Sequence, residues 1–363
     1  MPVLFHLADL HIGAPYDSLP PEAACVCRAS QLAALEHAVD RANDLDAAVI
    51  LIPGDLFDTP DPPLTLFSQV MSLLARAHCP VLISPGNHDY LHPHSPYRIA
   101  PMPQGIHVFS GTTLEPFALD DGHTVIWGAA FHGVSARIAL DAPLDCQKCN
   151  ILCVHAELYD DNGYNPLQPD AIGASGFDYA AFGHNHTFSG VKREDDTFYA
   201  CTGCFVGRGA HEAGSRGYLC GTVDKGVAEL AFVPAGGVEF ETLTQDISAI
   251  MDDRTLGRTL AARIPHAHDR MCLTVELTGE RRYEPDFAGL KRALGQVCVH
   301  AALRDRTVVV RDPWRYLAED GLRGAITRRF RKAWEEANES ERPTRLLSLQ
   351  YALAALDGED TPL

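Results

Sequence analysis

Two hydrophobic patterns alternate along the first half of the chain. Short apolar runs, such as residues 48–52, are rich in β-branched residues and indicate strands. The first of these runs is residues 3–7. A helix is predicted after it, over residues 28–43, because Leu32, Leu35 and Val39 recur there at helical spacing. A second helix is predicted over residues 63–77. Strands that alternate with helices in this way are typical of a layered α/β domain with parallel strand pairs.

Ten strands are predicted in the first two thirds of the chain. They span residues 3–7, 48–52, 81–84, 106–109, 124–128, 151–154, 179–182, 198–201, 218–223 and 228–233. After about residue 190 the helical periods stop, so we expect antiparallel hairpins to close the same domain.

A smaller α/β unit is predicted to follow. Residues 242–265 resemble a helical connecting segment, and a strand over 271–278 begins the unit. It continues with a helix over 286–294, strands near 297–303 and 307–311, and helices over 317–337 and 345–356. We therefore divide the 363 residues into a first domain (1–241), a connecting segment (242–269) and a small α/β unit with C-terminal helices (270–363).

The composition is that of a globular protein, with 46% hydrophobic and 21% charged residues. The apolar runs are far shorter than the roughly 20 residues of a membrane span, so no membrane association is expected. The first residues read as a strand rather than a signal peptide, and we expect a cytoplasmic protein. The 11 cysteines are expected to be reduced and mostly packed in the core, although Cys146-x-x-Cys149 and Cys201-x-x-Cys204 leave a structural zinc as an alternative.

Five predicted strand ends finish in residue types that bind metals. They read Ala8-Asp9-Leu10-His11, Gly54-Asp55-Leu56-Phe57-Asp58, Gly86-Asn87-His88-Asp89, Val154-His155-Ala156-Glu157 and Gly183-His184-Asn185-His186. Because the carboxyl ends of parallel strands face one crevice, these groups can converge although they are far apart in sequence.

The clusters supply seven oxygen or imidazole donors without a thiolate, a set that suits Mn, Fe or Zn. The seven are Asp9, His11, Asp55, Asn87, His155, His184 and His186. If one carboxylate bridges two ions, each ion has about four protein ligands, and Asp55 is the natural bridge. The formal net charge of −18 argues against non-specific electrostatic binding of nucleic acid. Carboxylates that hold divalent cations, however, contribute to that negative charge.

These motifs resemble those of the calcineurin-like metallophosphoesterase superfamily, whose pattern is DxH, GDxxD, GNH(D/E), H and GHxH. The first three are similar to those of SbcD-type DNA repair exonucleases, and in particular of YhaO-like ones. The resemblance covers about residues 1–240 and continues more weakly through the C-terminal unit. It implies two mixed sheets flanked by helices, with 1–241 as the nuclease domain and a small α/β capping domain after it.

The resemblance also implies a ligand assignment and a reaction. Two divalent ions, most often manganese, would be held by Asp9, His11, Asp55 and His186 and by Asp55, Asn87, His155 and His184. Such a pair activates a water for in-line attack on a phosphodiester. His88 is then free to protonate the leaving oxygen, and Asp89 is expected to orient it. Relatives from archaea and eukaryotes typically carry a histidine where this chain has Asp58, which we therefore expect to be a supporting or structural group.

Substrate and partner contacts are predicted less directly. Arg208, in a hairpin after the last motif, is a candidate phosphate contact. Arg328 and Arg329 belong to the one dense basic stretch, which is either a solvated helix face or a surface for DNA or a partner. By resemblance the partners are DNA and an SbcC-like or YhaN-like ATPase with a coiled-coil arm. A second copy of the chain is a further candidate.

Two other readings stay open at this point. The same centre could serve a phosphodiesterase or phosphatase for small phosphoesters or nucleotides. A scaffold that has lost catalysis is the other reading, but an intact set of seven donors plus His88 argues against it. Protein phosphatases of this superfamily show GDxVDRG and GNHE, and neither motif occurs here.

Overall fold

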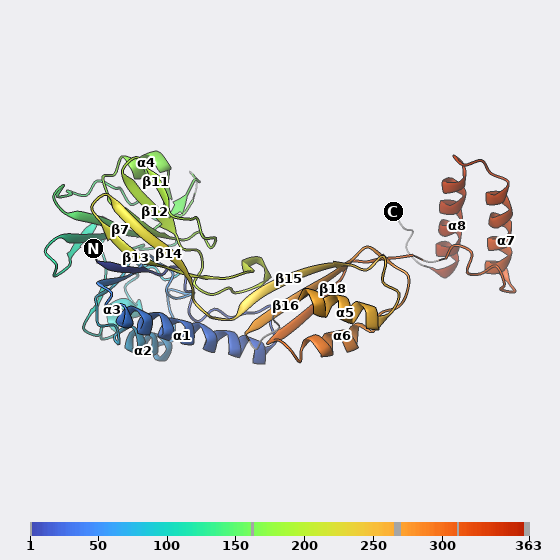
Figure 1. The fold of residues 1–363 in the computed structure, drawn as a ribbon, viewed down its shortest axis with the longest axis horizontal. Coiled ribbons are helices and arrows are strands. Elements are labelled where there is room, and N and C mark those ends of the chain that lie inside the picture. The colour runs from blue at the N-terminus through green and yellow to red at the C-terminus, as the bar shows by residue number, and fades with distance from the viewer. Residues whose placement is uncertain (1, 161–162, 265–269, 311, 359–363) are drawn as a thin grey trace. The chain divides into compact units, whose positions relative to one another are not determined.

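The computed structural model describes residues 2–160, 163–264, 270–310 and 312–358. The chain divides into two compact units. Figure 1 shows the helices and strands in the order of the chain. The first comprises residues 1–243, 266–275 and 291–302, and the second comprises residues 244–265, 276–290 and 303–363.

The first unit contains two six-stranded sheets, and both are mixed. The first sheet has the order β14-β13-β1-β2-β3-β4, in which β1 to β4 are parallel and β13 is antiparallel to both β1 and β14. Its strands are β1 (Val3–His6), β2 (Val49–Ile52), β3 (Val81–Ile83), β4 (Ile106–Val108), β13 (Gly217–Asp224) and β14 (Val227–Pro234).

The second sheet has the order β11-β12-β10-β7-β6-β5. Its four central strands are parallel, and the edge strands β5 and β11 are antiparallel to their neighbours. The strands are β5 (Glu115–Ala118), β6 (Thr124–Gly128), β7 (Cys149–His155), β10 (Tyr179–Gly183), β11 (Lys192–Glu194) and β12 (Thr197–Cys201).

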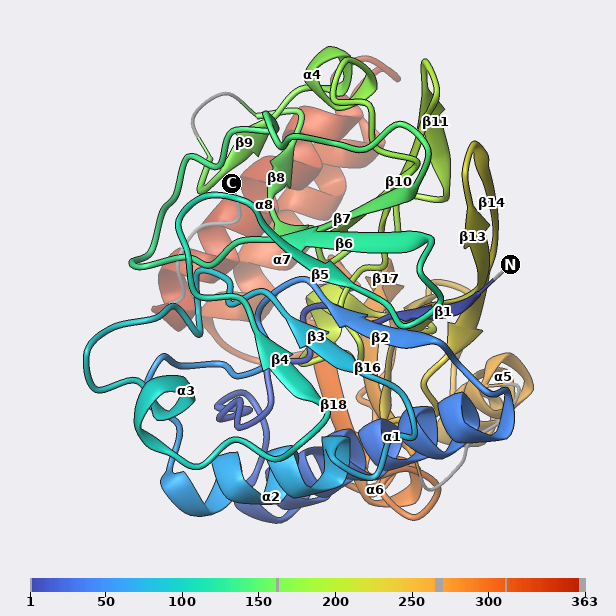
Figure 2. The ribbon, with the colours of Figure 1, turned by 90° about the vertical axis from the view of Figure 1, so that its left-hand side faces the viewer.

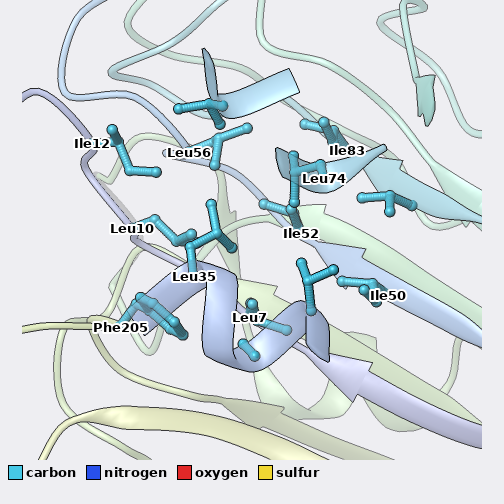
Figure 3. Close-up of a cluster of buried hydrophobic side chains, with 14 of the residues drawn as sticks. Leu7, Leu10, Ile12, Leu35, Ile50, Ile52, Leu56, Leu74, Ile83 and Phe205 are labelled. Carbon is cyan, nitrogen blue, oxygen red and sulfur yellow. The ribbon is translucent and has the colours of Figure 1, made fainter. Parts of the chain in front are cut away.

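Side chains of the central strands alternate between two hydrophobic layers. In β2, Val49 and Leu51 pack between the sheets, whereas Ile50 and Ile52 pack toward the helices. Helices α1 (Pro21–Asp44) and α2 (Leu64–Leu74) cover that outer face (Figure 2), and Leu35 and Leu74 belong to the cluster shown in Figure 3. Because strands buried on both faces need apolar residues at every position, these runs lack a polar alternation.

The remaining elements are shorter or lie later in the chain. In the first part of the chain they are α3 (Pro96–Ile99), the β8 (Glu157–Leu158) and β9 (Pro166–Leu167) pair, α4 (Pro169–Gly173) and a 3₁₀ turn (Ala210–Glu212). A three-stranded sheet follows, with the order β15 (Glu239–Asp246), β16 (Met271–Thr278), β18 (His300–Asp305). The last elements are α5 (Asp253–Arg263), β17 (Glu280–Arg281), α6 (Phe287–Leu294), β19 (Val308–Val309), α7 (Leu322–Glu335) and α8 (Arg342–Asp357).

The predicted fold class is confirmed by the two mixed sheets and their flanking helices. Two details were wrong. Residues 242–246 are not helical but continue strand β15, and helix α7 begins at Leu322 rather than near residue 317. The start of α7 follows Gly321, whose φ of +118° suits glycine and not a helix interior. The end of the predicted strand at residue 311 lies outside the described residues.

Candidate metal centre

The carboxyl ends of parallel strands bring the seven predicted donors together. Asp9 and His11 follow β1, Asp55 follows β2, and Asn87 follows β3. In the other sheet His155 is the last residue of β7 and pairs with Gly183, the last residue of β10, after which His184 and His186 come. The strand ends of both sheets therefore meet at one place, as expected for parallel strands.

Four of these donors have an unusual backbone conformation. Asp9, His11, Asp55 and His184 have φ values of +50°, +45°, +52° and +90°. Residues other than glycine rarely adopt this left-handed region, which costs of order 1–3 kcal/mol per residue. Such strain is found mainly at functional sites, where it aims side chains that a relaxed backbone would point elsewhere.

Glycines are required where the strand ends approach one another. A Cβ on Gly54 would lie 2.3 Å from Nδ1 of His155, and Gly54 also has a φ of +97°. A Cβ on Gly86 would lie 2.4 Å from Oδ1 of Asp55. These turns therefore exclude any larger residue if His155 and Asp55 are to stay in place.

We call Asp9, His11 and His186 the first ligand group. One ligand atom from each lies within 4.8 Å of the others, and Nε2 of His11 is 3.2 Å from Nε2 of His186. Both oxygens of Asp9 accept from the main-chain N–H of His184, at 2.8 and 3.0 Å. These contacts hold the Asp9 carboxylate beside the end of β10.

We call Asn87, His155 and His184 the second ligand group. Oδ1 of Asn87 lies 2.7 Å from Nε2 of His155 and 3.1 Å from Nδ1 of His184, and these two nitrogens are 3.2 Å apart. The three predicted donors therefore converge on one point.

Asp55 lies between the two groups. Its Oδ2 is 3.7 Å from Nε2 of His11 and 3.5 Å from Nε2 of His155. Its Oδ1 accepts from the main-chain N–H of His88 at 2.9 Å, which fixes the carboxylate. This is the position that a bridging ligand would take.

Burial keeps three of the histidines neutral. It lowers the pKa of His155 to about 3 and that of His11 and His184 to about 4. A neutral imidazole has a lone pair for a metal, so these rings can bind a cation at physiological pH. Burial and the neighbouring Asp55 raise the pKa of Asp9 well above its usual range, a cost that a bound cation would relieve.

The donor set fits metal ions because lone pairs face one another. Nδ1 of His155 lies 3.0 Å from the main-chain oxygen of Pro53, which can only accept, so the proton belongs on Nδ1. Nε2 of His155 then presents a lone pair to Oδ1 of Asn87 at 2.7 Å. Two acceptors at this distance repel each other unless a cation lies between them. In metal-binding histidines, the ring nitrogen that does not bind the metal usually donates to a carbonyl or a carboxylate, and Nδ1 of His155 is placed to do so.

His88 lies at the edge of the two groups, and its side chain is 42% exposed. Its Nδ1 is 3.1 Å from the main-chain oxygen of Asp58, and its ring lies edge-on to that of His11. The predicted pairing of Asp89 with His88 was wrong. The buried Asp89 carboxylate accepts from Tyr97 and from the main-chain N–H groups of Gly86 and residues 55–57, so it ties two ligand-bearing loops together. Burial raises its pKa to about 6.

Arg208 reaches the first ligand group through two carboxylates. It forms ion pairs with Asp58 at 3.1 Å and with Glu212 at 2.9 Å. Glu212 was not singled out from the sequence. Glu157 ended one of the five motifs but was given no role, and its Oε2 lies 3.5 Å from Nε2 of His184. Burial alone would raise the pKa of Glu212, but hydrogen bonds from His186 and Arg208 outweigh it and hold the pKa below its usual range.

The other predicted groups lie outside this centre. Arg328 and Arg329 are exposed on α7 in the second unit, where Arg328 donates to the main-chain oxygens of Leu317 and Glu319. In the CxxC pairs, Cys146 is exposed, whereas Cys149, Cys201 and Cys204 are buried. Among the described residues, the groups that could hold a metal contain only histidine and aspartate.

Comparisons with known proteins agree with this geometry. The sequence pattern of the calcineurin-like phosphoesterases matches residues 2–188, and the chain belongs to this family. Members of this family bind two divalent metals. It is also similar to the "Uncharacterized metallophosphoesterase YhaO" of Bacillus subtilis (strain 168), with 26% identity over 263 residues. That alignment covers 67% of this chain and 62% of the relative. In the described part of the chain, none of the helices has the length and apolar character of a membrane span.

Proposed function

We propose that this chain is a two-metal phosphodiesterase that hydrolyses DNA as an exonuclease-like repair enzyme, with manganese as its metal. The observation that carries the proposal is the pair of adjoining ligand groups, joined by Asp55, with the exposed His88 beside them. The choice of DNA as the substrate depends on the first three motifs, which are similar to those of SbcD-type nucleases.

Two divalent ions in this centre would activate water and neutralise the charge that develops on a phosphate. The chain's own contribution is to orient the donors and to supply a proton. The main-chain oxygen of Asp58 accepts from Nδ1 of His88, so a protonated His88 has Nε2 free to donate to the leaving oxygen. Asp55 Oδ1 holds the main chain of His88 and so sets its distance from both groups.

A cleavage assay tests the proposal. The protein is stripped of metal, Mn²⁺, Mg²⁺ or Zn²⁺ is added back, and end-labelled linear DNA is supplied beside a generic phosphodiester reporter. We expect Mn²⁺ to restore cleavage of both substrates. Cleavage of the reporter but never of DNA would replace our proposal by an enzyme for small phosphoesters or nucleotides.

Two variants serve as matched controls in that assay. His88→Ala removes the proposed proton donor, whereas His132→Ala removes an exposed histidine whose Nε2 lies 2.8 Å from the main-chain oxygen of Ser110. We expect the first to lose cleavage and the second to keep it. Equal turnover by both variants would contradict the role of His88.

We further propose a cytoplasmic complex with an SbcC-like or YhaN-like coiled-coil ATPase. The support comes from the α7–α8 pair, on which Leu322, Leu347 and Leu356 are 64%, 45% and 38% exposed beside a basic stretch. We propose that these leucines belong to one apolar surface, since a contiguous exposed apolar patch marks a site that binds a partner. Co-elution with such an ATPase, lost in Leu322→Glu/Leu347→Glu, tests this part; co-elution that survives the double variant would exclude these leucines as the contact.

A further inference from the structure

Glu212 is a buried acid beside the first ligand group. The residue is 2% exposed, and its Oε1 lies 2.8 Å from Nδ1 of His186. Its Oε2 accepts from the main-chain N–H of Arg208 at 2.8 Å. A buried carboxylate needs such partners, because an unpaired charge in the interior is strongly destabilising.

The guanidinium of Arg208 pairs with Glu212 and with a second carboxylate, that of Asp58. Nη2 of Arg208 lies 2.9 Å from Oε1 of Glu212, and Nη1 lies 3.1 Å from Oδ1 of Asp58. That same Asp58 oxygen is 3.1 Å from Nδ1 of His11. Each carboxylate therefore connects Arg208 to the Nδ1 atom of one histidine in the first ligand group.

We infer that Asp58, Arg208 and Glu212 form a clamp that positions His11 and His186 for the first metal ion. A carboxylate oxygen lies 3.1 Å from Nδ1 of His11 and 2.8 Å from Nδ1 of His186, which favours the tautomer with the proton on Nδ1. Both Nε2 lone pairs are then free for a metal, and the two Nε2 atoms lie 3.2 Å apart. Nη2 of Arg208 also lies 2.9 Å from Nδ1 of His186; with the proton on Nδ1, Glu212 Oε1 accepts from both groups. Arg208 is thus a positioning residue and not the phosphate contact that the sequence suggested.

The clamp serves one ligand group only. In the second group, Nδ1 of His155 faces the main-chain oxygen of Pro53, and Nε2 of His184 lies 3.5 Å from Oε2 of Glu157. Loss of the clamp should therefore weaken one ion and spare the other. Loss of an outer hydrogen-bond partner typically lowers metal affinity 10- to 100-fold.

The test is a titration of the metal-free full-length chain with Mn²⁺, followed by calorimetry and by metal analysis. The wild type is expected to bind two ions. In Glu212→Ala and Arg208→Ala we expect one of the two dissociation constants to rise about 10- to 100-fold, and Glu212→Gln, which keeps an oxygen acceptor, to fall between these variants and the wild type. In a His11→Ala background, Glu212→Ala should have little further effect on the remaining ion, because both changes act on the same site.

Glu115→Gln provides a matched control. Glu115 also closes a loop through two main-chain N–H groups, those of Ser110 and Gly111, and it belongs to neither ligand group. We expect Glu115→Gln to bind both ions like the wild type, with thermal unfolding measured for every variant to confirm the fold.

Unchanged binding of both ions in folded Glu212→Ala and Glu212→Gln, or equal weakening of both ions, would overturn the inference. Normal metal binding in Arg208→Ala with a raised KM for the reporter would make Arg208 a phosphate contact after all.

The inference rests on the two-ion centre of the proposed function but not on its substrate. If DNA is never cleaved and the Mn²⁺ titrations agree with our expectation, the clamp stands and only the DNA proposal fails. If DNA is cleaved while the Glu212 variants bind both ions normally, the clamp alone fails.

Discussion

The two ligand groups differ in what holds their histidines in place. Side chains support the first group, because His11 and His186 each face a carboxylate that is paired with Arg208. The main chain supports the second group more directly, since His155 is the last residue of a central strand and its Nδ1 faces the carbonyl of Pro53. The first ion should therefore be sensitive to distant side-chain changes, and the second to changes in the backbone turns.

Asp55→Asn should have the largest effect, because it is the residue that adjoins both groups. The amide keeps the shape but removes the negative charge that both ions would share. We expect both ions to bind more weakly and reporter cleavage to fall by more than about 100-fold. Metal analysis after dialysis checks the result; loss of one ion alone would show that Asp55 is not the bridge.

His88→Ala should lower turnover without a change in metal content, because His88 belongs to neither group. General acid catalysis typically contributes about 10²- to 10⁴-fold, so kcat should fall within that range. Parallel measurements of kcat and of bound Mn²⁺ separate the two effects. A variant that also loses an ion would instead place His88 among the ligands.

The turn before Asp55 gives a sharper test of the second group. In Gly54→Ala the new Cβ would meet the His155 ring, and the residue would keep a strained positive φ. We expect a loss of about 1–3 kcal/mol in the free energy of unfolding and weaker binding of the second ion only. Denaturant unfolding and Mn²⁺ titration measure these quantities. Selective loss of the first ion would contradict our expectation that the second ion is the one sensitive to the backbone turns.

The smallest effect is expected for Glu157→Gln. Oε2 of Glu157 is 3.5 Å from His184 and its side chain is 24% exposed, so water can replace much of its support. We predict a change of about tenfold or less in the affinity for the second ion. A loss as large as that of Glu212→Ala, seen in the same titration, would mean that both groups depend equally on carboxylates.

The sequence was informative where the signals are local. Each of the seven donors ends or follows a short apolar strand, and parallel pairing, as of β1 with β2 and of β7 with β10, brings such ends together within each sheet. The layered fold could be predicted for the same reason. The strand over residues 242–246 could not be predicted. Its sequence is mostly polar and lacks the alternation of apolar and polar residues that marks a half-buried strand.

The supporting residues were harder to predict because their contacts are not periodic. Glu212 lies in a short 3₁₀ turn, 26 residues from His186 in sequence. No pattern in the residues around it predicts the contact. Asp89 shows the opposite problem. It is adjacent to His88 in sequence, yet in this tight turn the two side chains point to different partners. Sequence proximity therefore gave the wrong partner, and Asp58, thirty residues earlier, is the one beside His88.

The central claim is that the two ligand groups hold a pair of divalent ions that share Asp55. Anomalous diffraction from crystals grown with Mn²⁺ tests it most directly. We predict two peaks about 3.5–4 Å apart, one beside His11 and His186 and the other beside His155 and His184. A single peak, or no peak within reach of Asp55, would contradict the account.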